Sequence, residues 1–333
     1  MFVLDSYLLA VIFCFITMLC WGSWANTQKL ASKEWRFELF YWDYVIGVLL
    51  LSAIFAFTLG SSGSAGRSFI ADIGQAEFSN ILSAMIGGAV FNAANILLVA
   101  AIAIAGMAVA FPVGIGIALV WGVIINYIAT PLGNPTILFL GVALVVAAII
   151  IDAAAYKKLP SQTKGVSTKG LVLSVVCGIL MGFFYRFVAS SMSTDFVNME
   201  AGKLSPYTAV FFFSVGLFLS NFVINTIVMK KPFEGESVSI SAYFKGGLRL
   251  HSIGVLGGII WCIGMSFSII ASGQAGFAIS YGLGQGATMV AALWGVFIWK
   301  EFKEAPAGTN KLITLMFICF ALGLGLIITA RLG

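Results

Sequence analysis

Residues 87–123 read GGAVFNAANILLVAAIAIAGMAVAFPVGIGIALVWGV, and residues 257–296 carry the same landmarks in the same order. Most of these landmarks lie 170 positions apart, and the last group is shifted by three further residues. A shared order of this kind over two apolar segments is more than composition alone would produce, so the sequence predicts an internal repeat. The matching residues are Gly87-Gly88 with Gly257-Gly258, Gly106 with Gly276, Gly114 and Gly116 with Gly284 and Gly286, and Trp121-Gly122-Val123 with Trp294-Gly295-Val296.

The composition of the chain is that of a membrane protein. Its 333 residues are 60% hydrophobic and only 9% charged, and the mean hydropathy is +1.05. Apolar runs recur along the whole chain, each long enough to cross a hydrocarbon core of about 30 Å. Backbone groups in lipid need internal hydrogen bonds, and runs of this length favour helices over barrel strands. The sequence therefore predicts an all-α, polytopic membrane protein.

Ten candidate transmembrane helices follow from the apolar runs and the polar breaks between them. The repeated segments fall on the third and fourth helices and on the eighth and ninth. Each helix of the first copy is offset by five helices from its match in the second copy. Because five is an odd number, the two units enter the membrane in opposite senses, which is the inverted-repeat plan of secondary transporters. Very short connections at 105–106 and 272–274 imply antiparallel hairpins. The expected spans are 6–27, 39–60, 79–104, 107–128, 136–155, 170–192, 207–229, 251–271, 275–299 and 312–331.

The repeat also divides the chain. We expect a first five-helix repeat at 1–155, a cytoplasmic linker at 156–169 and a second five-helix repeat at 170–333. Fourteen of the 18 Lys and Arg fall in the loops after the first, fifth, seventh and ninth helices. Positive charge stays cytoplasmic, so these loops are expected inside and both termini outside. The fourteen are Lys29, Lys33, Arg36, Lys157, Lys158, Lys164, Lys169, Lys230, Lys231, Lys245, Arg249, Lys300, Lys303 and Lys311.

This charge bias accounts for the net charge of +5 as a topology signal, without a nucleic-acid partner. The lipid bilayer is the expected environment, and the expected location is the cell (inner) membrane, crossed several times. The sequence leaves a homodimer open.

Polar side chains within the spans are the candidates for a binding site, because each costs free energy in hydrocarbon unless it is paired or hydrated. Asn92 and Asn95 lie three positions apart, Asn221 and Asn225 lie four apart, and Tyr281 begins a set at i, i+4 and i+7. The alternative for each is a hydrogen bond between helices without a ligand. Three polar, uncharged faces favour a shared cavity. The expected substrate-binding residues are Trp24, Asn26, Asn92, Asn95, Asn221, Asn225, Trp261, Tyr281, Gln285 and Thr288.

The first span ends in CWGSWANTQKL, residues 20–30. In the expected topology this stretch approaches the cytoplasmic boundary, where the alternative for its tryptophans is an interfacial aromatic belt. A rough alignment of the first helix on the sixth places Ser23-Trp24 opposite Tyr185-Arg186. We therefore predict that Trp24 and Asn26 line or gate the inner vestibule.

Charged residues within the spans are few, and three of them bear on the site. Asp43, in the first turns of the second helix, is the first candidate for binding a coupling ion, H⁺ or Na⁺. The alternative is that Asp43 caps its helix or pairs with Lys29 or Lys33. Asp152, near the end of the fifth helix, is expected to face the lysines that follow it. Arg186 lies close to the external boundary, where it either snorkels outward or takes part in gating.

The chemistry of these faces limits the ligand. Amides, hydroxyls and indoles suit a neutral solute with many donors and acceptors, and aromatic planes stack on sugar faces or flat heterocycles. The five cysteines lie in apolar segments without a CxxC pair, so neither a metal nor a cofactor is expected. His251, the only histidine, has no carboxylate partner nearby in the sequence, and the glycine-rich runs do not follow strands. We expect that the chain is not an enzyme.

Several short motifs match those of known transporters. They are Asp43-Tyr44, Ala56-Phe57-Thr58-Leu59-Gly60, Gly87-Gly88 followed by Asn95, Asn126-Tyr127, Gly106-Met107 and Gly114-Ile115-Gly116-Ile117-Ala118. On these residues the chain resembles the drug/metabolite transporter superfamily, and within it the ureide permeases and the bacterial glucose/ribose and rhamnose sugar porters. The resemblance implies ten helices in two inverted five-helix units and proton-coupled uptake of a small polar solute. The central loop YKKLPSQTKGVSTK, residues 156–169, lacks the GxxxxGK[ST] pattern of plant ureide permeases, so nucleotide-linked regulation is not implied.

The expected function is a secondary active transporter that imports a small neutral polar solute by alternating access, with proton coupling. Sugar is the first expected solute, and ureide or nucleobase-like compounds come next. The alternative is a multidrug or metabolite efflux carrier of the same superfamily. A receptor or channel is a further alternative, against which the internal repeat argues.

Overall fold

The computed structural model describes residues 1–32, 34–159 and 167–332, which form a bundle of long helices. No β-strand occurs in this described part, where a single isolated bridge joins Met192 and Leu204. Lys33, Lys164 and residues 160–166 of the expected linker at 156–169 lie outside the described residues.

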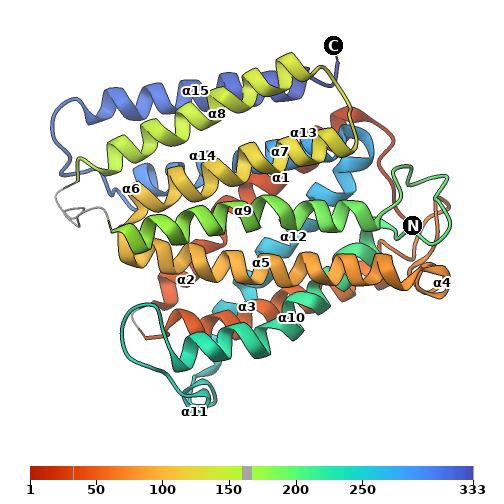
Figure 1. Cartoon of the computed structure of the whole chain (residues 1–333), viewed down its shortest axis with the longest axis horizontal. Coiled ribbons are helices and arrows are strands. Elements are labelled where there is room, and N and C mark those ends of the chain that lie inside the picture. The colour runs from red at the N-terminus through yellow and green to blue at the C-terminus, as the bar shows by residue number, and fades with distance from the viewer. Residues whose placement is uncertain (33, 160–166, 333) are drawn as a thin grey trace.

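The two ends of the bundle differ. Figure 1 shows both termini and α4 (Phe69–Gln75) at one end, which we call the terminus end. The short helix α11 (Ile240–Tyr243) lies at the opposite end. Lys29 and Lys300 also belong to this opposite end, which we call the cation-rich end.

Among the described residues, ten helices are long and apolar enough to cross a membrane, which confirms the number of spans predicted from the sequence. Their boundaries differ from the predicted ones by a few residues, because polar residues continue several helices beyond their apolar core. The first span consists of α1 (Tyr7–Ser23) and α2 (Ala25–Ala31). The others are α3 (Phe37–Phe57), α5 (Phe78–Ala105), α6 (Met107–Ala110) with η1 (Phe111–Ile115) and α7 (Gly116–Ala129), α8 (Pro135–Tyr156), α9 (Thr168–Ser191), α10 (Pro206–Lys230), α12 (Leu248–Ala275), α13 (Phe277–Gly284) with α14 (Ala287–Leu293) and η2 (Trp294–Ile298), and α15 (Thr309–Thr329).

Capping residues set several helix starts. The Asn134 side chain accepts hydrogen bonds from the backbone N–H groups of Thr136 and Ile137, and proline follows as the first residue of α8. Ser205 caps α10 in the same way, again directly before a proline. A side-chain acceptor at the N-cap satisfies otherwise unpaired N–H groups, and proline at N1 has no N–H that needs a partner. The local sequence therefore determines where these two helices begin.

The two tight joints of the repeat have the same backbone conformation. Gly106 has φ 78° and ψ 163°, and Gly276 has φ 82° and ψ 155°. Positive φ of this size is readily adopted only by glycine, which explains why each joint falls on one. The prediction of the second joint at 272–274 was wrong by a few residues, because α12 continues to Ala275 and the chain turns only at Gly276.

The helices after these two joints are both interrupted. In the first, Pro112 lies within the π-helical segment η1, where its missing N–H cannot complete a regular ladder. In the second, Gln285 and Gly286 separate α13 from α14, and a second π segment, η2, follows. Irregular turns of this kind are frequent at functional sites in helices. The expectation of two continuous spans therefore missed these interruptions.

Glycines allow close helix crossings at matching places in the two halves. A Cβ at Gly88 of α5 would overlap the carbonyl oxygen of Phe213 on α10, and a Cβ at Gly258 of α12 would overlap that of Tyr44 on α3. Gly88 and Gly258 are 170 positions apart, the offset of the sequence repeat. The pairing agrees with an inverted repeat, which stays a prediction.

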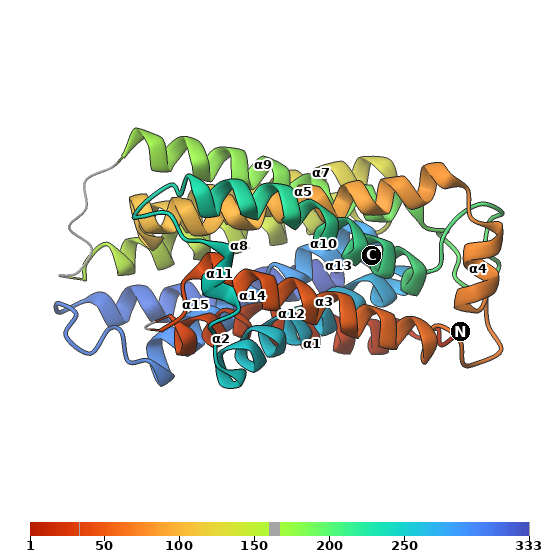
Figure 2. The ribbon, with the colours of Figure 1, turned by 90° about the horizontal axis from the view of Figure 1, so that it is seen from below.

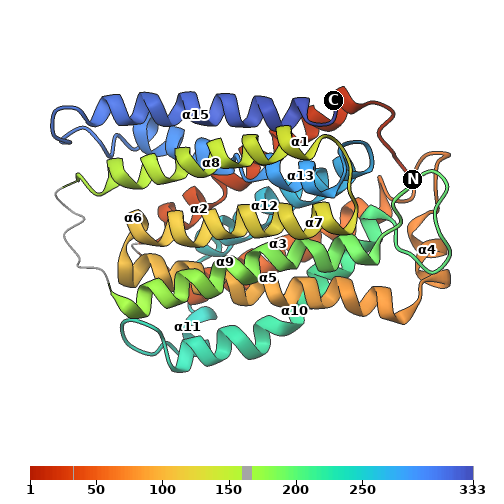
Figure 3. The ribbon, with the colours of Figure 1, turned by 45° about the horizontal axis from the view of Figure 1, so that its top comes forward.

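The remaining packing places α8 against α15 and gathers the other spans around a common interior. Gly141 on α8 and Gly323 on α15 approach each other's backbone, so these two helices lie side by side along one edge (Figure 3). In the view from below, α1, α3 and α12 gather on one side, and α5 and α9 pack together on the other (Figure 2). The candidate site lies between these two groups.

Candidate functional site

A cavity of about 400 Å³ extends from the middle of the bundle to the cation-rich end. Its innermost residues, Phe91 and Trp261, lie near the centres of α5 and α12. Its outer lining includes Lys29 and Ser32, whose side chains are exposed. Volumes of several hundred Å³ are typical of sites for small molecules. The cavity therefore opens at the cation-rich end.

Aromatic rings form the inner end of the cavity. The Trp261 ring lies 4.3 Å from that of Phe91 and 6.0 Å from that of Trp21, measured between ring centroids. Phe184 and Phe213 extend the same cluster, at 5.1 Å and 5.7 Å from Phe91. Packed rings at these distances are rigid and offer flat faces to a ligand.

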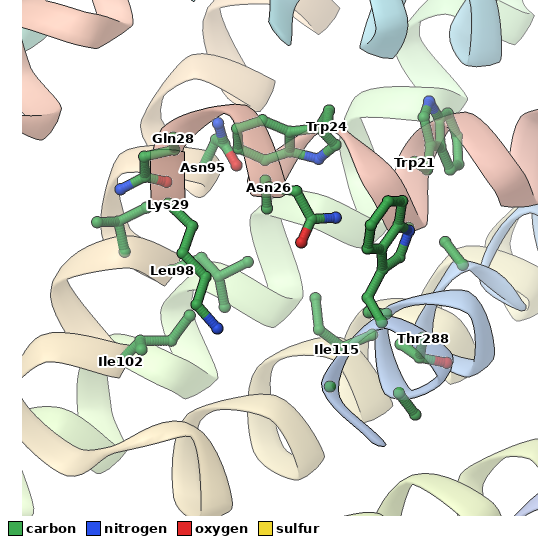
Figure 4. Close-up of a pocket in the computed structure, with 18 of the residues that line it drawn as sticks. Trp21, Trp24, Asn26, Gln28, Lys29, Asn95, Leu98, Ile102, Ile115 and Thr288 are labelled. Carbon is green, nitrogen blue, oxygen red and sulfur yellow. The ribbon is translucent and has the colours of Figure 1, made fainter. Parts of the chain in front are cut away.

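The first span is divided into α1 and α2 where it passes the cavity. Trp24 stands between α1 and α2, and its ring lies 4.9 Å from Tyr44. The Asn26 side chain donates to the Ser23 carbonyl and accepts a 2.6 Å hydrogen bond from Trp299 Nε1. In Figure 4, Trp24, Asn26 and Asn95 lie on one side of the cavity, with Thr288 on the other. The stretch predicted to form a vestibule therefore reaches the cavity.

The cavity brings together six of the ten predicted binding residues. Asn95 Nδ2 lies 3.4 Å from the Tyr41 hydroxyl, and Thr288 donates a 2.9 Å hydrogen bond to the Gln285 carbonyl. Amide and hydroxyl groups therefore lie beside the aromatic faces. No measurement on a ligand tests their role, so it stays a prediction. The six are Trp24, Asn26, Asn95, Trp261, Gln285 and Thr288.

Three of the other four predicted residues make hydrogen bonds between helices outside the cavity lining. Asn92 donates to Ser220 Oγ at 2.8 Å, and Asn225 donates to the Glu38 carbonyl at 2.8 Å. The Tyr281 hydroxyl reaches the carbonyls of Ala118 and Met181, at 3.1 Å and 3.2 Å. These contacts correspond to the alternative of polar groups that join helices.

Asn221 differs from its neighbours. It is fully buried on α10, yet neither its amide nitrogen nor its oxygen has a hydrogen-bond partner among the described residues. A buried amide without partners costs free energy. Asn221 therefore has no structural reason to be polar in this conformation.

Asp43 is buried at the cation-rich end, outside the cavity lining. Tyr243 donates a 2.6 Å hydrogen bond to its carboxylate, His251 Nδ1 lies 2.9 Å away and Trp35 Nε1 lies 3.4 Å away. Burial together with this carboxylate raises the pKa of the Tyr243 hydroxyl above its ordinary value. His251, the only histidine in the sequence, thus has its partner Asp43 at a distance of 208 positions along the chain. Lys29 pairs with Glu301 and not with Asp43.

Arg186 is half-buried on α9 and does not line the cavity. Its gating role stays a prediction.

A polar cluster at the cavity entrance was missed by the sequence reasoning. Glu301 accepts hydrogen bonds from Lys29 Nζ and from the Tyr156 hydroxyl, each at 2.7 Å. The Lys29 ammonium also lies 4.2 Å from the centroid of the Trp299 ring. In the sequence Glu301 lies between Lys300 and Lys303, in a loop that the charge pattern predicts to be cytoplasmic. The feature of the sequence that could have indicated an inward-facing Glu301 is its position soon after Trp294 and Trp299.

Asp152 also lines this entrance, contrary to the expectation that it faces the following lysines. Lys157 and Lys158 are exposed, and no hydrogen bond or ion pair joins Asp152 to any of the described residues. The physical reason is geometric, because Asp152 precedes the end of α8 by a full turn and faces the bundle interior. In the described part of the chain, no group of three or more His, Cys, Asp or Glu is placed to hold a metal.

The chain is similar to proteins of several organisms. Ureide permease 1 of Arabidopsis thaliana is 22% identical over 99% of both chains. The probable glucose uptake protein GlcU of Staphylococcus aureus is 28% identical over 34% of each chain. Transmembrane protein 144 homolog B of Dictyostelium discoideum is 27% identical over 48% of this chain and 40% of its own.

A solved crystal structure covers 97% of both chains with a TM-score of 0.58 and 14% sequence identity, which supports the fold alone. The family model described as ureide permease matches residues 40–167 and 161–330, which together span most of the helical bundle. The chain is thus a membrane transporter of small solutes and not an enzyme, and it belongs to the ureide permease family.

Proposed function

We propose that this protein is a secondary transporter that imports a small, neutral, polar solute through the cavity between its two halves. The observation that carries the proposal is the cavity itself, where aromatic faces such as Trp24 and Trp261 stand beside the amides of Asn26 and Asn95. Flat rings stack on flat or ring-shaped solutes, and amides hydrogen-bond to both donors and acceptors.

A flat ureide or nucleobase-like compound is the first solute that we propose, and a sugar is the second. This order reverses the expectation from the residues alone. Its support is that the relative named ureide permease aligns over the whole chain, whereas the relative named glucose uptake protein aligns over a third of it. The stacked rings of Trp21 and Trp261 in the cavity lining also suit a planar compound.

Alternating access is part of the proposal. The cavity reaches the cation-rich end and stops at the aromatic cluster in mid-bundle, as an inward-facing state would. Matching glycine crossings in the two halves provide similar hinges for the opposite opening. On the positive-inside rule, the cation-rich end lies in the cytoplasm and both termini lie outside, in the cell (inner) membrane.

The test is uptake by purified protein in lipid vesicles, with labelled allantoin, uracil and glucose offered separately. We expect saturable uptake and exchange of allantoin or uracil, reduced when an alanine replaces Trp261. Asn198→Ala, in an exposed loop, is the matched control and should behave as wild type. If none of the three solutes enters or exchanges, the proposal is contradicted.

Efflux of drugs or metabolites is the second candidate, favoured by the apolar part of the lining, which includes Leu98, Ile102 and Ile115. Raised drug resistance of cells that express the protein, without uptake of any polar solute, would support efflux over import.

A further inference from the structure

We propose that Asp152 is the proton-binding group through which a pH gradient drives transport, an inference that rests on the proposed transport function. Asp152 belongs to the spanning helix α8 and lines the cavity at its entrance. A coupling group has to share a compartment with the solute, and Asp152 is one of two acidic side chains that line this cavity.

The other acidic side chain already has partners. Glu301 is bound by the Lys29 ammonium and by the Tyr156 hydroxyl, each at 2.7 Å, so its negative charge is compensated. Asp152 has no such donor among the described residues, and the Glu301 charge acts on it from nearby. A lone carboxylate in a spanning helix is costly unless something neutralises it. Binding a proton removes the charge and makes the side chain a hydrogen-bond donor.

The other elements around Asp152 contribute little charge. The segments that pack against α8 near this position, α6 and η1, contain no ionisable side chain. On α15 the only charged residue is Lys311, which is exposed. The groups that face Asp152 are therefore Glu301, Tyr156 and the already paired Lys29. A solute that fills the cavity displaces water and so raises the free-energy cost of keeping Asp152 ionised. Solute and proton therefore favour each other's binding.

Asp43, the first candidate from the sequence, differs from Asp152 in its hydrogen bonds. Three donors or ring nitrogens, from Trp35, Tyr243 and His251, surround its carboxylate, and hydrogen bonds to the charged form stabilise it. Asp43 also lies outside the lining of the cavity, whereas Asp152 belongs to it. This arrangement suits a side chain that fastens α11 and α12 to α3.

The experiment compares Asp152→Asn with Asp43→Asn, two matched carboxylate-to-amide changes in spanning helices. The proteins are reconstituted in vesicles, and accumulation of labelled allantoin or uracil is measured with the outside one pH unit more acidic. One proton per solute allows at most about a tenfold accumulation. In wild type and in Asp43→Asn, we expect the solute concentration inside the vesicles to rise above that outside. In Asp152→Asn, we expect the two concentrations to become equal and no more. Asp152→Glu, which keeps the carboxylate, should restore part of the response.

A second measurement separates coupling from damage to the fold. In weakly buffered detergent solution, solute binding should make the medium more alkaline for wild type and leave it unchanged for Asp152→Asn at equal thermal stability. Accumulation by Asp152→Asn equal to that of wild type, or accumulation driven by a sodium gradient instead of a pH gradient, would overturn the proposal. Wild type that exchanges solute but ignores the pH gradient would also overturn it, while the transport function stands. Wild type that exchanges nothing would contradict the transport function itself.

Discussion

Trp24 is the residue of the first span that links the α1–α2 break to the cavity. Its place near the end of an apolar run, followed by polar residues, singled it out, but an interfacial tryptophan would look the same. The structure places it at the break between α1 and α2, against Tyr44 and beside the cavity. Whether a polar residue faces a cavity or another helix depends on tertiary packing, which explains why Asn95 lines the cavity whereas Asn92 does not.

Trp24→Ala should impair transport far more than folding. A ring that stacks on a flat heterocycle contributes about 1–3 kcal/mol, so uptake at low solute concentration should fall by about tenfold. The ring is only partly buried, so the thermal midpoint of the detergent-purified protein should change little. Uptake in vesicles and thermal unfolding are measured on the same preparation. If uptake and thermal stability fell to the same extent, Trp24 would serve packing and not the binding of solute.

Asn221→Leu should raise stability and lower transport. The buried Asn221 amide has no partner among the described residues, and its replacement by an apolar side chain of similar volume removes a penalty of about 1–3 kcal/mol. We infer that the amide finds its partner in another conformation, which the variant would lose. Unfolding and uptake assays check the two effects separately. Unchanged uptake would show that Asn221 has no part in the cycle.

At the scale of helices, most of the fold was predictable and the interruptions were not. Ten apolar runs are a direct consequence of bilayer thickness, and their glycine joints at Gly106 and Gly276 follow from backbone sterics. The π segment at Pro112 and the break at Gln285 leave the hydrophobic pattern unchanged, so no periodicity reveals them. The entrance cluster around Glu301 depends on contacts between residues more than 140 positions apart, which a single sequence does not encode locally.

Gly88→Ala and Gly258→Ala should destabilise the protein to a similar extent. At each site the added Cβ overlaps a backbone carbonyl of the crossing helix, and overpacking of this kind costs about 1–3 kcal/mol or more. Gly325→Ala on α15 is the control, because a Cβ added there meets no described atom within 4 Å, and alanine favours helix by about 1 kcal/mol. Thermal unfolding in detergent compares the three. Similar stability of all three would contradict the paired crossings.

For the whole molecule, the asymmetry of charge predicts how it lies in the membrane. Ser62, at the terminus end, and Ser237, in the loop between α10 and α11, are both exposed. Both substitutions are made in a variant without its five native cysteines. Ser62→Cys should react with a membrane-impermeant thiol reagent added to intact cells. Ser237→Cys should react only after the membrane is permeabilised. The reverse pattern would invert the proposed topology.

In the proposed transport cycle, one cavity between the two halves opens alternately to the two sides. The accessibility of a single residue in that cavity tests this proposal. Thr288 lines the cavity and lies well away from both ends of its span. With a cysteine at position 288 in the cysteine-free protein, an impermeant thiol reagent is applied separately to each side of oriented vesicles, with and without solute. We predict labelling from the cation-rich side without solute, and additional labelling from the terminus side when transported solute is present. Labelling from the cation-rich side alone, whatever solute is added, would contradict alternating access through this cavity.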